Sequence, residues 1–154
     1  MTAMRDTIAQ AMKQALKDKD QVALATIRLI SAALKDRDIA ARGQDRHDGI
    51  SDDEILSMLQ TMIKQRQESA RMYEDGGRPD LMETERAEIA IIQQFLPEPL
   101  SEAEIEAAIK EAVVSTQAAS VKDMGKVMAH LKAEHAGQMD FSAVSQLVKS
   151  RLMG

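Results

Sequence analysis

The chain has 154 residues, of which 44% are hydrophobic, 29% are charged and only 2% are aromatic, and it contains no cysteine. The hydrophobic fraction argues against a disordered chain, and the lack of cysteine excludes disulfides, thiolate metal sites and cysteine nucleophiles. A formal net charge of −5 argues against broad, non-specific nucleic-acid binding, which needs a positive surface, and DNA is therefore not expected as a partner.

Apolar residues recur at helical spacing along nearly the whole chain. A first predicted helix contains Met4 and ends in the polar sequence KDKD, where Asp20 can cap a second helix. The second helix ends before the polar loop 42–49. Because strand-forming aromatic and β-branched residues are also scarce, the sequence predicts an all-α protein.

Two more predicted helices complete an N-terminal bundle. Ser51 and Glu54 have the spacing of a capping box, which begins a long third helix. Gly76 and Gly77 end that helix, and Pro79 suits the first turn of a fourth, where its missing N–H costs nothing. The residues that we expect the fourth helix to bury are Leu81, Ile89, Ile92 and Phe95.

The sequence FLPEPLSEAEI is the clearest boundary in the chain. Pro97 and Pro99 exclude helix and favour a stiff, extended connector. Three shorter helices follow, and their ends are marked by Ser101 with Glu104, Ser120 with Asp123, Gly137, and Asp140. The sequence therefore predicts a bundle of about four helices in residues 1–97 and a smaller three-helix domain in residues 101–154.

We expect a soluble, cytoplasmic protein. The N-terminal segment lacks the apolar core of a secretory signal. The longest apolar stretch, VALATIRLISAAL, is too short to cross a bilayer and contains Arg28. These features predict that the chain has no membrane partner. Arg28 itself is expected to pair with a carboxylate such as Glu85 or Glu88.

Residues suited to catalysis are few. His47 lies in the charged loop, and His135 points away from His130. His130 and Glu134 are four residues apart and share a helix face, but two ligands do not complete a metal site, and a solvated ion pair is the simpler interpretation. With no phosphate-binding glycine loop or Ser–His pair, we expect no cofactor and no metal. An enzyme stays an alternative only if a partner or metal completes a site.

Lys64, Glu68 and Arg71 form a polar face in the segment MIKQRQESARMY. Steps of four and three residues return to the same side of a helix, so these side chains lie together. The favoured interpretation is an ion-paired surface in solvent, where each pair contributes little. The alternative is a polar face on which another protein docks.

Gly125 is the most informative residue of the C-terminal part, because glycine inside a helix costs about 1 kcal/mol relative to alanine. Either a close helix crossing or a ligand near the backbone has to compensate. Lys122 and Lys126 share one face with Gly125 nearby. On these features alone, helix packing with solvated lysines is favoured over a binding site.

Five stretches, taken in order, carry a resemblance to a known family. They are TIRLISAALK (26–35), IKQRQESARMYEDGGRPDLMETERAEI (63–89), FLPEPLSEAEI (95–105), KDMGKVM (122–128) and GQMDFSAVSQLVKSRL (137–152). Their combination resembles the YqeY family, small bacterial proteins that share a domain with the B subunit of the tRNA-dependent Glu/Asp-tRNA amidotransferase. The resemblance implies an N-terminal helical bundle followed by a three-helix domain.

In that amidotransferase, the similar domain is a tail that contacts the outer corner of tRNA while catalysis takes place elsewhere. The resemblance implies that tRNA-facing positions here lie around Lys122, Gly125 and Lys126 and in the turn from Gly137 to Asp140. The amidase and kinase-like parts are absent from this chain. An amidotransferase label, meaning carbon–nitrogen ligation with glutamine as amido donor, would therefore describe association only.

Two functions are accordingly expected ahead of catalysis. The first is a non-catalytic module that binds structured RNA, above all tRNA, through its shape and its phosphates. The second is an adaptor that docks on an amidotransferase or another translation-related protein.

Overall fold

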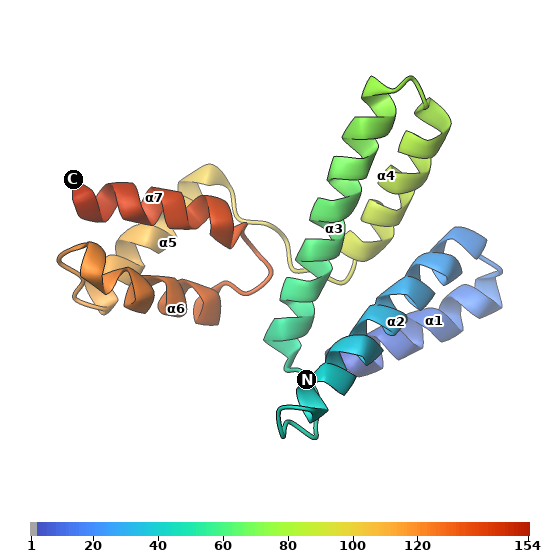
Figure 1. Ribbon diagram of the computed structural model, residues 1–154, viewed down its shortest axis with the longest axis horizontal. Coiled ribbons are helices and arrows are strands. Elements are labelled where there is room, and N and C mark those ends of the chain that lie inside the picture. The colour runs from blue at the N-terminus through green and yellow to red at the C-terminus, as the bar shows by residue number, and fades with distance from the viewer. Residues whose placement is uncertain (1–2) are drawn as a thin grey trace. The chain divides into compact units, whose positions relative to one another are not determined.

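The computed structural model describes residues 3–154, and in this range the chain is helical without any strand (Figure 1). The predicted all-α class is therefore confirmed. The chain divides into two compact units, Met1–Leu96 and Pro97–Gly154. Among the described residues, no helix is both long and apolar enough to cross a membrane.

The first unit contains α1 (Met4–Asp18), α2 (Gln21–Arg42), α3 (Asp52–Asp75) and α4 (Pro79–Gln93). Figure 1 shows α1 beside α2 and α3 beside α4, and α2 also packs on α4. The predicted caps are present: the Asp20 carboxylate accepts from the Ala23 N–H, and Ser51 forms a capping box with Glu54. These caps satisfy backbone donors that a helix start leaves unpaired.

The core of the first unit is built from aliphatic side chains and methionine. Ile30, Ile55 and Leu59 are completely buried. In the fourth helix only Ile92 is fully buried, whereas Leu81 and Ile89 are half-buried. The prediction for Phe95 is corrected, because α4 ends at Gln93 and the ring packs against the core from the turn that follows.

The predicted ion pair of Arg28 is wrong. Arg28 follows the buried Ile27 by one residue, which is about 100° around the helix, and it is exposed. Arg66 of α3 contacts Glu88 of α4 instead, with 2.7 Å between Nε and Oε2, and also donates to the Met62 carbonyl. The hairpin of α3 and α4 therefore contains the part-buried ion pair that the sequence assigned to α2.

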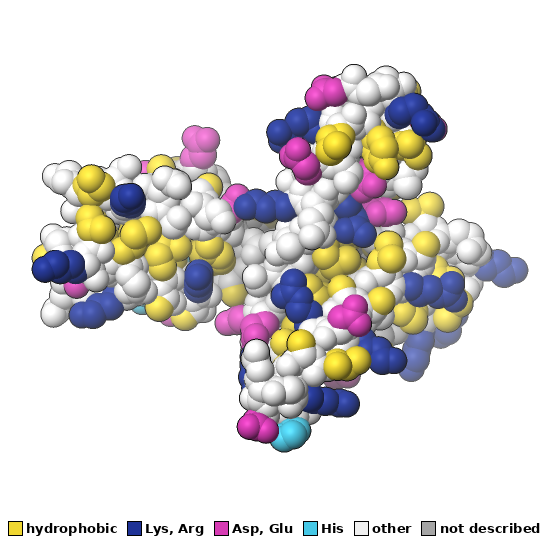
Figure 2. All heavy atoms as spheres, viewed as in Figure 1, with side chains coloured by type: hydrophobic (Ala, Val, Ile, Leu, Met, Phe, Trp, Pro, Cys, Tyr) yellow, Lys and Arg dark blue, Asp and Glu magenta, His cyan; other side chains and the backbone are white. Residues whose placement is uncertain are grey.

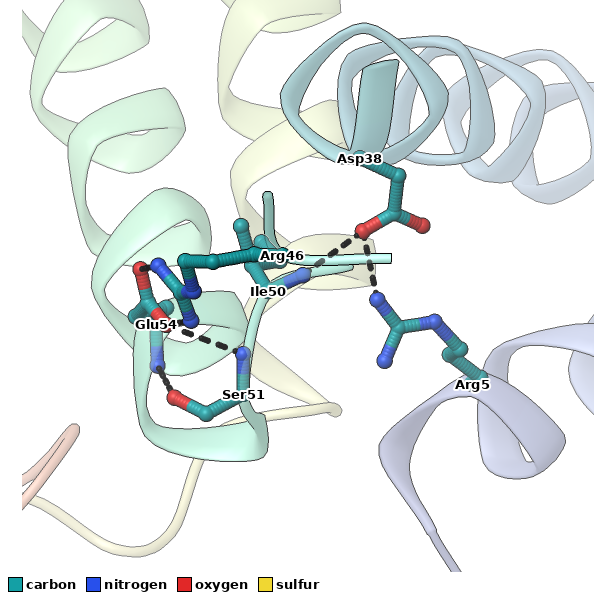
Figure 3. Close-up of polar contacts among 6 residues, drawn as sticks. All are labelled: Arg5, Asp38, Arg46, Ile50, Ser51 and Glu54. Carbon is teal, nitrogen blue, oxygen red and sulfur yellow. Dashed lines mark hydrogen bonds and ion pairs between the residues drawn. The ribbon is translucent and has the colours of Figure 1, made fainter. Parts of the chain in front are cut away.

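Two carboxylates fasten the loop between α2 and α3 (Figure 3). Oδ1 of Asp38 accepts from Nη2 of Arg5 at 2.5 Å and from the Ile50 N–H at 2.9 Å. Glu54 pairs with Arg46, and its carboxylate also accepts from the Ser51 N–H at 3.0 Å. The loop predicted as solvated is thus anchored at its C-terminal end.

The second unit contains α5 (Glu102–Ser115), a short 3-10 helix (Val121–Asp123), α6 (Met124–Glu134) and α7 (Phe141–Met153). The capping box predicted at Ser101 is present, and Ser120 with Asp123, predicted to begin the next helix, forms a capping box that begins the 3-10 helix before α6. The helix expected to end at Gly137 ends at Glu134, and Gly137 shapes the turn beyond it with φ 78°. The core of this unit is made of Ala108, Ile109, Ala112, Val127, Leu131, Met139, Val144 and Val148.

Gly49→Ala should destabilise the chain more than Gly77→Ala. Both glycines have positive φ, 83° and 71° respectively, so either substitution strains the backbone by about 1 kcal/mol. A Cβ on Gly49 would also lie 2.7 Å from Cγ of Asp38 and 2.8 Å from Nη2 of Arg5, whereas Gly77 has nothing within 4 Å. We expect Gly49→Ala to cost about 2–4 kcal/mol in urea unfolding. An equal loss of unfolding free energy in the two variants would show that the contact between Asp38 and Arg5 beside Gly49 does not matter for stability.

Stability should fall in acid partly through Glu54. The hydrogen bond from Arg46, and then that from the Ser51 N–H, lower the pKa of Glu54 from 4.5 to about 2. Because the folded-state pKa lies below the unfolded one, the stabilisation is present above pH 4.5 and is lost as the pH falls toward 2. The effect should be modest, since the Glu54 side chain is 42% exposed.

Urea unfolding at about pH 5 and about pH 3 measures this loss. Glu54→Gln should reduce the difference in unfolding free energy between the two pH values. Glu83→Gln, a change of the same kind at an exposed position of α4, should leave the difference as it is in the unmodified chain. If the unfolding free energy of Glu54→Gln falls between the two pH values as much as that of the unmodified chain, Glu54 is not a source of the acid sensitivity.

Candidate functional site

The start of α6 presents two lysines on a turn that is fixed by backbone hydrogen bonds. Oδ2 of Asp123 accepts from the N–H groups of Ala119 and Ser120 at 2.8 and 3.2 Å, and Oγ of Ser120 accepts from the Lys122 N–H at 3.3 Å. Lys122 and Lys126 are exposed on either side of this start. The turn is therefore held by groups other than the two ammonium groups, which remain accessible.

Gly125 lies in the first turn of α6. Its surroundings decide whether a close helix crossing or a ligand near the backbone explains a glycine at this position. A Cβ built on Gly125 meets nothing within 4 Å, and the residue is exposed. A close helix crossing is therefore wrong as the reason for this glycine within the described part of the chain. The other explanation, a ligand that approaches the backbone, fits the open surface.

Positive charge collects in the later helices of the second unit. Residues 102–115 contain four glutamates and one lysine, a net charge of −3, whereas residues 120–154 contain five basic and three acidic side chains, a net charge of +2. Two of those three acids, Asp123 and Asp140, accept hydrogen bonds from backbone N–H groups as caps. The bonds from Ala119 and then Ser120 lower the pKa of Asp123. The unit thus has an acidic α5 and a mildly basic α6 and α7.

Gly137 and Asp140 have structural roles. Gly137 is buried with positive φ. The neighbouring Gln138 accepts from the Leu100 N–H at 2.9 Å through its carbonyl, and its side chain donates to the Glu98 carbonyl. Asp140 caps α7 by accepting from the N–H groups of residues 142 and 143. These bonds hold the connector to the turn before α7, and the predicted contact of this turn with tRNA stays a prediction.

The face of Lys64, Glu68 and Arg71 lies on α3 as predicted from its spacing. Glu68 Oε2 and Arg71 Nη1 are 3.7 Å apart, and both side chains are well exposed. An exposed pair of this kind contributes less than about 1 kcal/mol. The geometry matches the ion-paired surface that was favoured, and docking on this face stays a prediction.

His130 does not pair with Glu134. Its Nε2 lies 2.9 Å from Oε2 of Glu111, so it links α6 to α5. Glu111 also accepts from the Ser115 hydroxyl, and this bond, followed by that to His130, lowers the pKa of Glu111. Within residues 3–154, no group of three or more His, Cys, Asp or Glu side chains is arranged to hold a metal ion.

A groove with a volume of about 580 Å³ lies between α1 and α2 and was not predicted from the sequence. Its lining residues are Arg5, Ile8, Ala9, Met12, Ser31, Leu34, Lys35, Asp38, Ile39 and Arg42. Figure 2 shows hydrophobic side chains gathered over α1 and α2 with lysine and arginine beside them. The helical periodicity of each segment was visible in the sequence, but the groove depends on which faces the two helices leave uncovered after pairing.

Comparison with known proteins shows the family of the chain. The model of the family described as Yqey-like protein matches residues 5–152. A relative from Lachancea thermotolerans, named "Altered inheritance of mitochondria protein 41, mitochondrial", is 28% identical over 92% of this chain and 75% of its own length. A relative of the same name from Meyerozyma guilliermondii is 32% identical over 61% of this chain and 47% of its own length.

The prediction of a cytoplasmic location is contradicted by these relatives, because their names describe mitochondrial proteins. They come from fungi, so they also do not support the bacterial origin expected from the resemblance. The resemblance itself is confirmed, since the family model covers nearly the whole described chain. The chain belongs to the Yqey-like protein family.

Proposed function

We propose that the chain is a non-catalytic binding module that holds structured RNA, above all tRNA, at the start of α6. Membership of the Yqey-like family suggests a non-catalytic accessory role. The observation that carries the RNA proposal is Gly125, a helical glycine with open space where its Cβ would be. No packing contact offsets the cost of this glycine, which is about 1 kcal/mol in a helix interior and smaller in a first turn.

A phosphate is the chemical group that best fits this surface. The lack of a side chain at Gly125 lets a ligand approach the first turn of α6, where the helix dipole favours negative charge. Lys122 and Lys126 can each neutralise a phosphate. Asp123 lies between them, but its carboxylate is committed to backbone N–H groups. The arrangement favours binding along a sugar–phosphate backbone.

The binding proposed here reads shape and phosphates rather than bases. Stacking of bases requires exposed aromatic rings. Tyr73, Phe95 and Phe141, the three aromatic residues of the chain, are all half-buried. Folded RNA offers phosphates at fixed spacing, which a rigid capped turn can match. In an amidotransferase system, a chain of this kind would act on the tRNA substrate and supply no step of amide transfer.

Lys126→Glu should weaken tRNA binding, whereas Lys110→Glu should not. Both lysines are exposed in the second unit, but Lys110 lies on the acidic α5. Reversing a charge that contacts phosphate should reduce affinity about tenfold at low salt. Fluorescence anisotropy with labelled deacylated tRNA measures the two affinities. If the two variants lose affinity equally, the site at α6 is wrong.

Gly125→Ala should make the chain more stable and the RNA complex weaker. Alanine at this open, exposed helical position should stabilise the chain by about 0.5–1 kcal/mol. Its methyl group would stand where the ligand approaches, so the dissociation constant for tRNA should rise about fivefold. Ala129→Gly, at an exposed position in the same helix, is the control and should lose stability with binding unchanged. A more stable Gly125→Ala variant with normal affinity would remove the basis of the proposal.

A further inference from the structure

The groove between α1 and α2 runs along both helices. Its lining residues recur at steps of three and four, from Arg5 to Met12 on α1 and from Ser31 to Arg42 on α2. Ile8 and Leu34, which are buried, form its apolar floor together with the half-buried Met12. Ile39 stands at its edge with 55% of its surface exposed. The floor is therefore apolar, and the exposed apolar surface of the groove comes from Ala9 and Ile39 beside it.

The α2 edge of the groove is positively charged, although the chain as a whole is acidic. Arg5, Lys35 and Arg42 line it, and Asp38 is the one acidic side chain among the lining residues. Asp38 is already occupied by Arg5 and by the Ile50 N–H. Lys35 and Arg42 are exposed and form no ion pair with any residue in the described range. A matching occupant would bring apolar side chains for the floor and carboxylates for the α2 edge.

We propose that this groove binds an acidic amphipathic helix of a partner protein. Such a helix presents apolar residues at i, i+3, i+4 and i+7, which can enter a groove between two parallel ridges. Acidic residues beside that apolar row would reach Lys35 and Arg42. Met12 on the floor adapts its shape to different apolar side chains, since methionine is unbranched and flexible.

A small anionic ligand fits the groove less well than a helix. Pockets for small ligands enclose most of the ligand surface. Here the lining includes exposed side chains of both helices, among them Ala9, Lys35 and Ile39. An open strip with charged edges leaves one side of its occupant in solvent, as the polar face of an amphipathic helix requires. The residues of the groove are also distinct from those proposed to bind RNA.

The test uses the full chain and a fluorescein-labelled helical peptide of about 15 residues, the length of α1. The peptide is based on alanine and carries leucine at i, i+3, i+4, i+7 and i+11 with glutamate on both flanks. A second peptide replaces every glutamate by lysine, and a third keeps the composition of the first but scrambles the leucine positions. Anisotropy titration should show the acidic peptide binding at least about tenfold tighter than either control.

Variants of the chain then locate the peptide. Ala9→Trp fills the groove from an exposed position and should weaken the acidic peptide about tenfold, as should Lys35→Glu combined with Arg42→Glu. Ala40→Trp, an exposed site on α2 outside the lining, should change the affinity less than about twofold. Circular dichroism and thermal unfolding check that each variant folds.

Three results would overturn the proposal. The first is equal affinity for the acidic and basic peptides, and the second is binding that Ala9→Trp leaves unchanged. The third is a concentration-dependent dimer, measured by sedimentation, that Ala9→Trp abolishes, because the groove would then belong to a second copy of the chain. The proposed tRNA site consists of other residues, namely Lys122, Gly125 and Lys126. A negative result for the groove therefore leaves the tRNA proposal unaffected, and a negative result for tRNA leaves the groove proposal unaffected.

Discussion

Two prolines in the connector set the constraint on which the rest of the structure depends. Pro97 and Pro99 lack the backbone N–H that a continuous helix needs, and residues 97–101 contain no regular secondary structure. Helix formation therefore stops after α4 and begins again at the capping box of Ser101. Each side of the break must bury apolar surface of its own, and two separate hydrophobic cores result.

Each core leaves a different surface to solvent. In the first unit, α1 buries Ile8 and Ala15 and leaves Ala9 exposed, and its residues from Arg5 to Met12 line a groove with α2. In the second unit, acidic side chains lie on α5 and most of the basic ones on later helices. One small chain thus offers an apolar groove with a basic edge and, at other residues, a lysine-flanked helix start. Both surfaces are suited to binding, which agrees with an accessory role.

Much of the fold could be predicted because its signals are local. Capping boxes at Ser51, Ser101 and Ser120 use residues three apart, and all three are present. Features that depend on contacts between helices could not be predicted. Examples are the pairing of Glu88 with Arg66 instead of Arg28, and that of His130 with Glu111 instead of Glu134. The spacing identified Gly125 as unusual, but only the structure showed that no helix crosses it.

Binding of tRNA at the start of α6 is best measured by titrating deacylated tRNA into the full chain, from low to physiological salt, with a DNA duplex as control. We expect saturable binding that prefers tRNA to the DNA duplex. We also expect that the logarithm of the binding constant falls with the logarithm of salt concentration with a slope of about −2, because two lysines neutralise phosphates. Absence of binding at low salt, where phosphate contacts are strongest, would contradict an RNA-binding role, as would equal affinity for the DNA duplex.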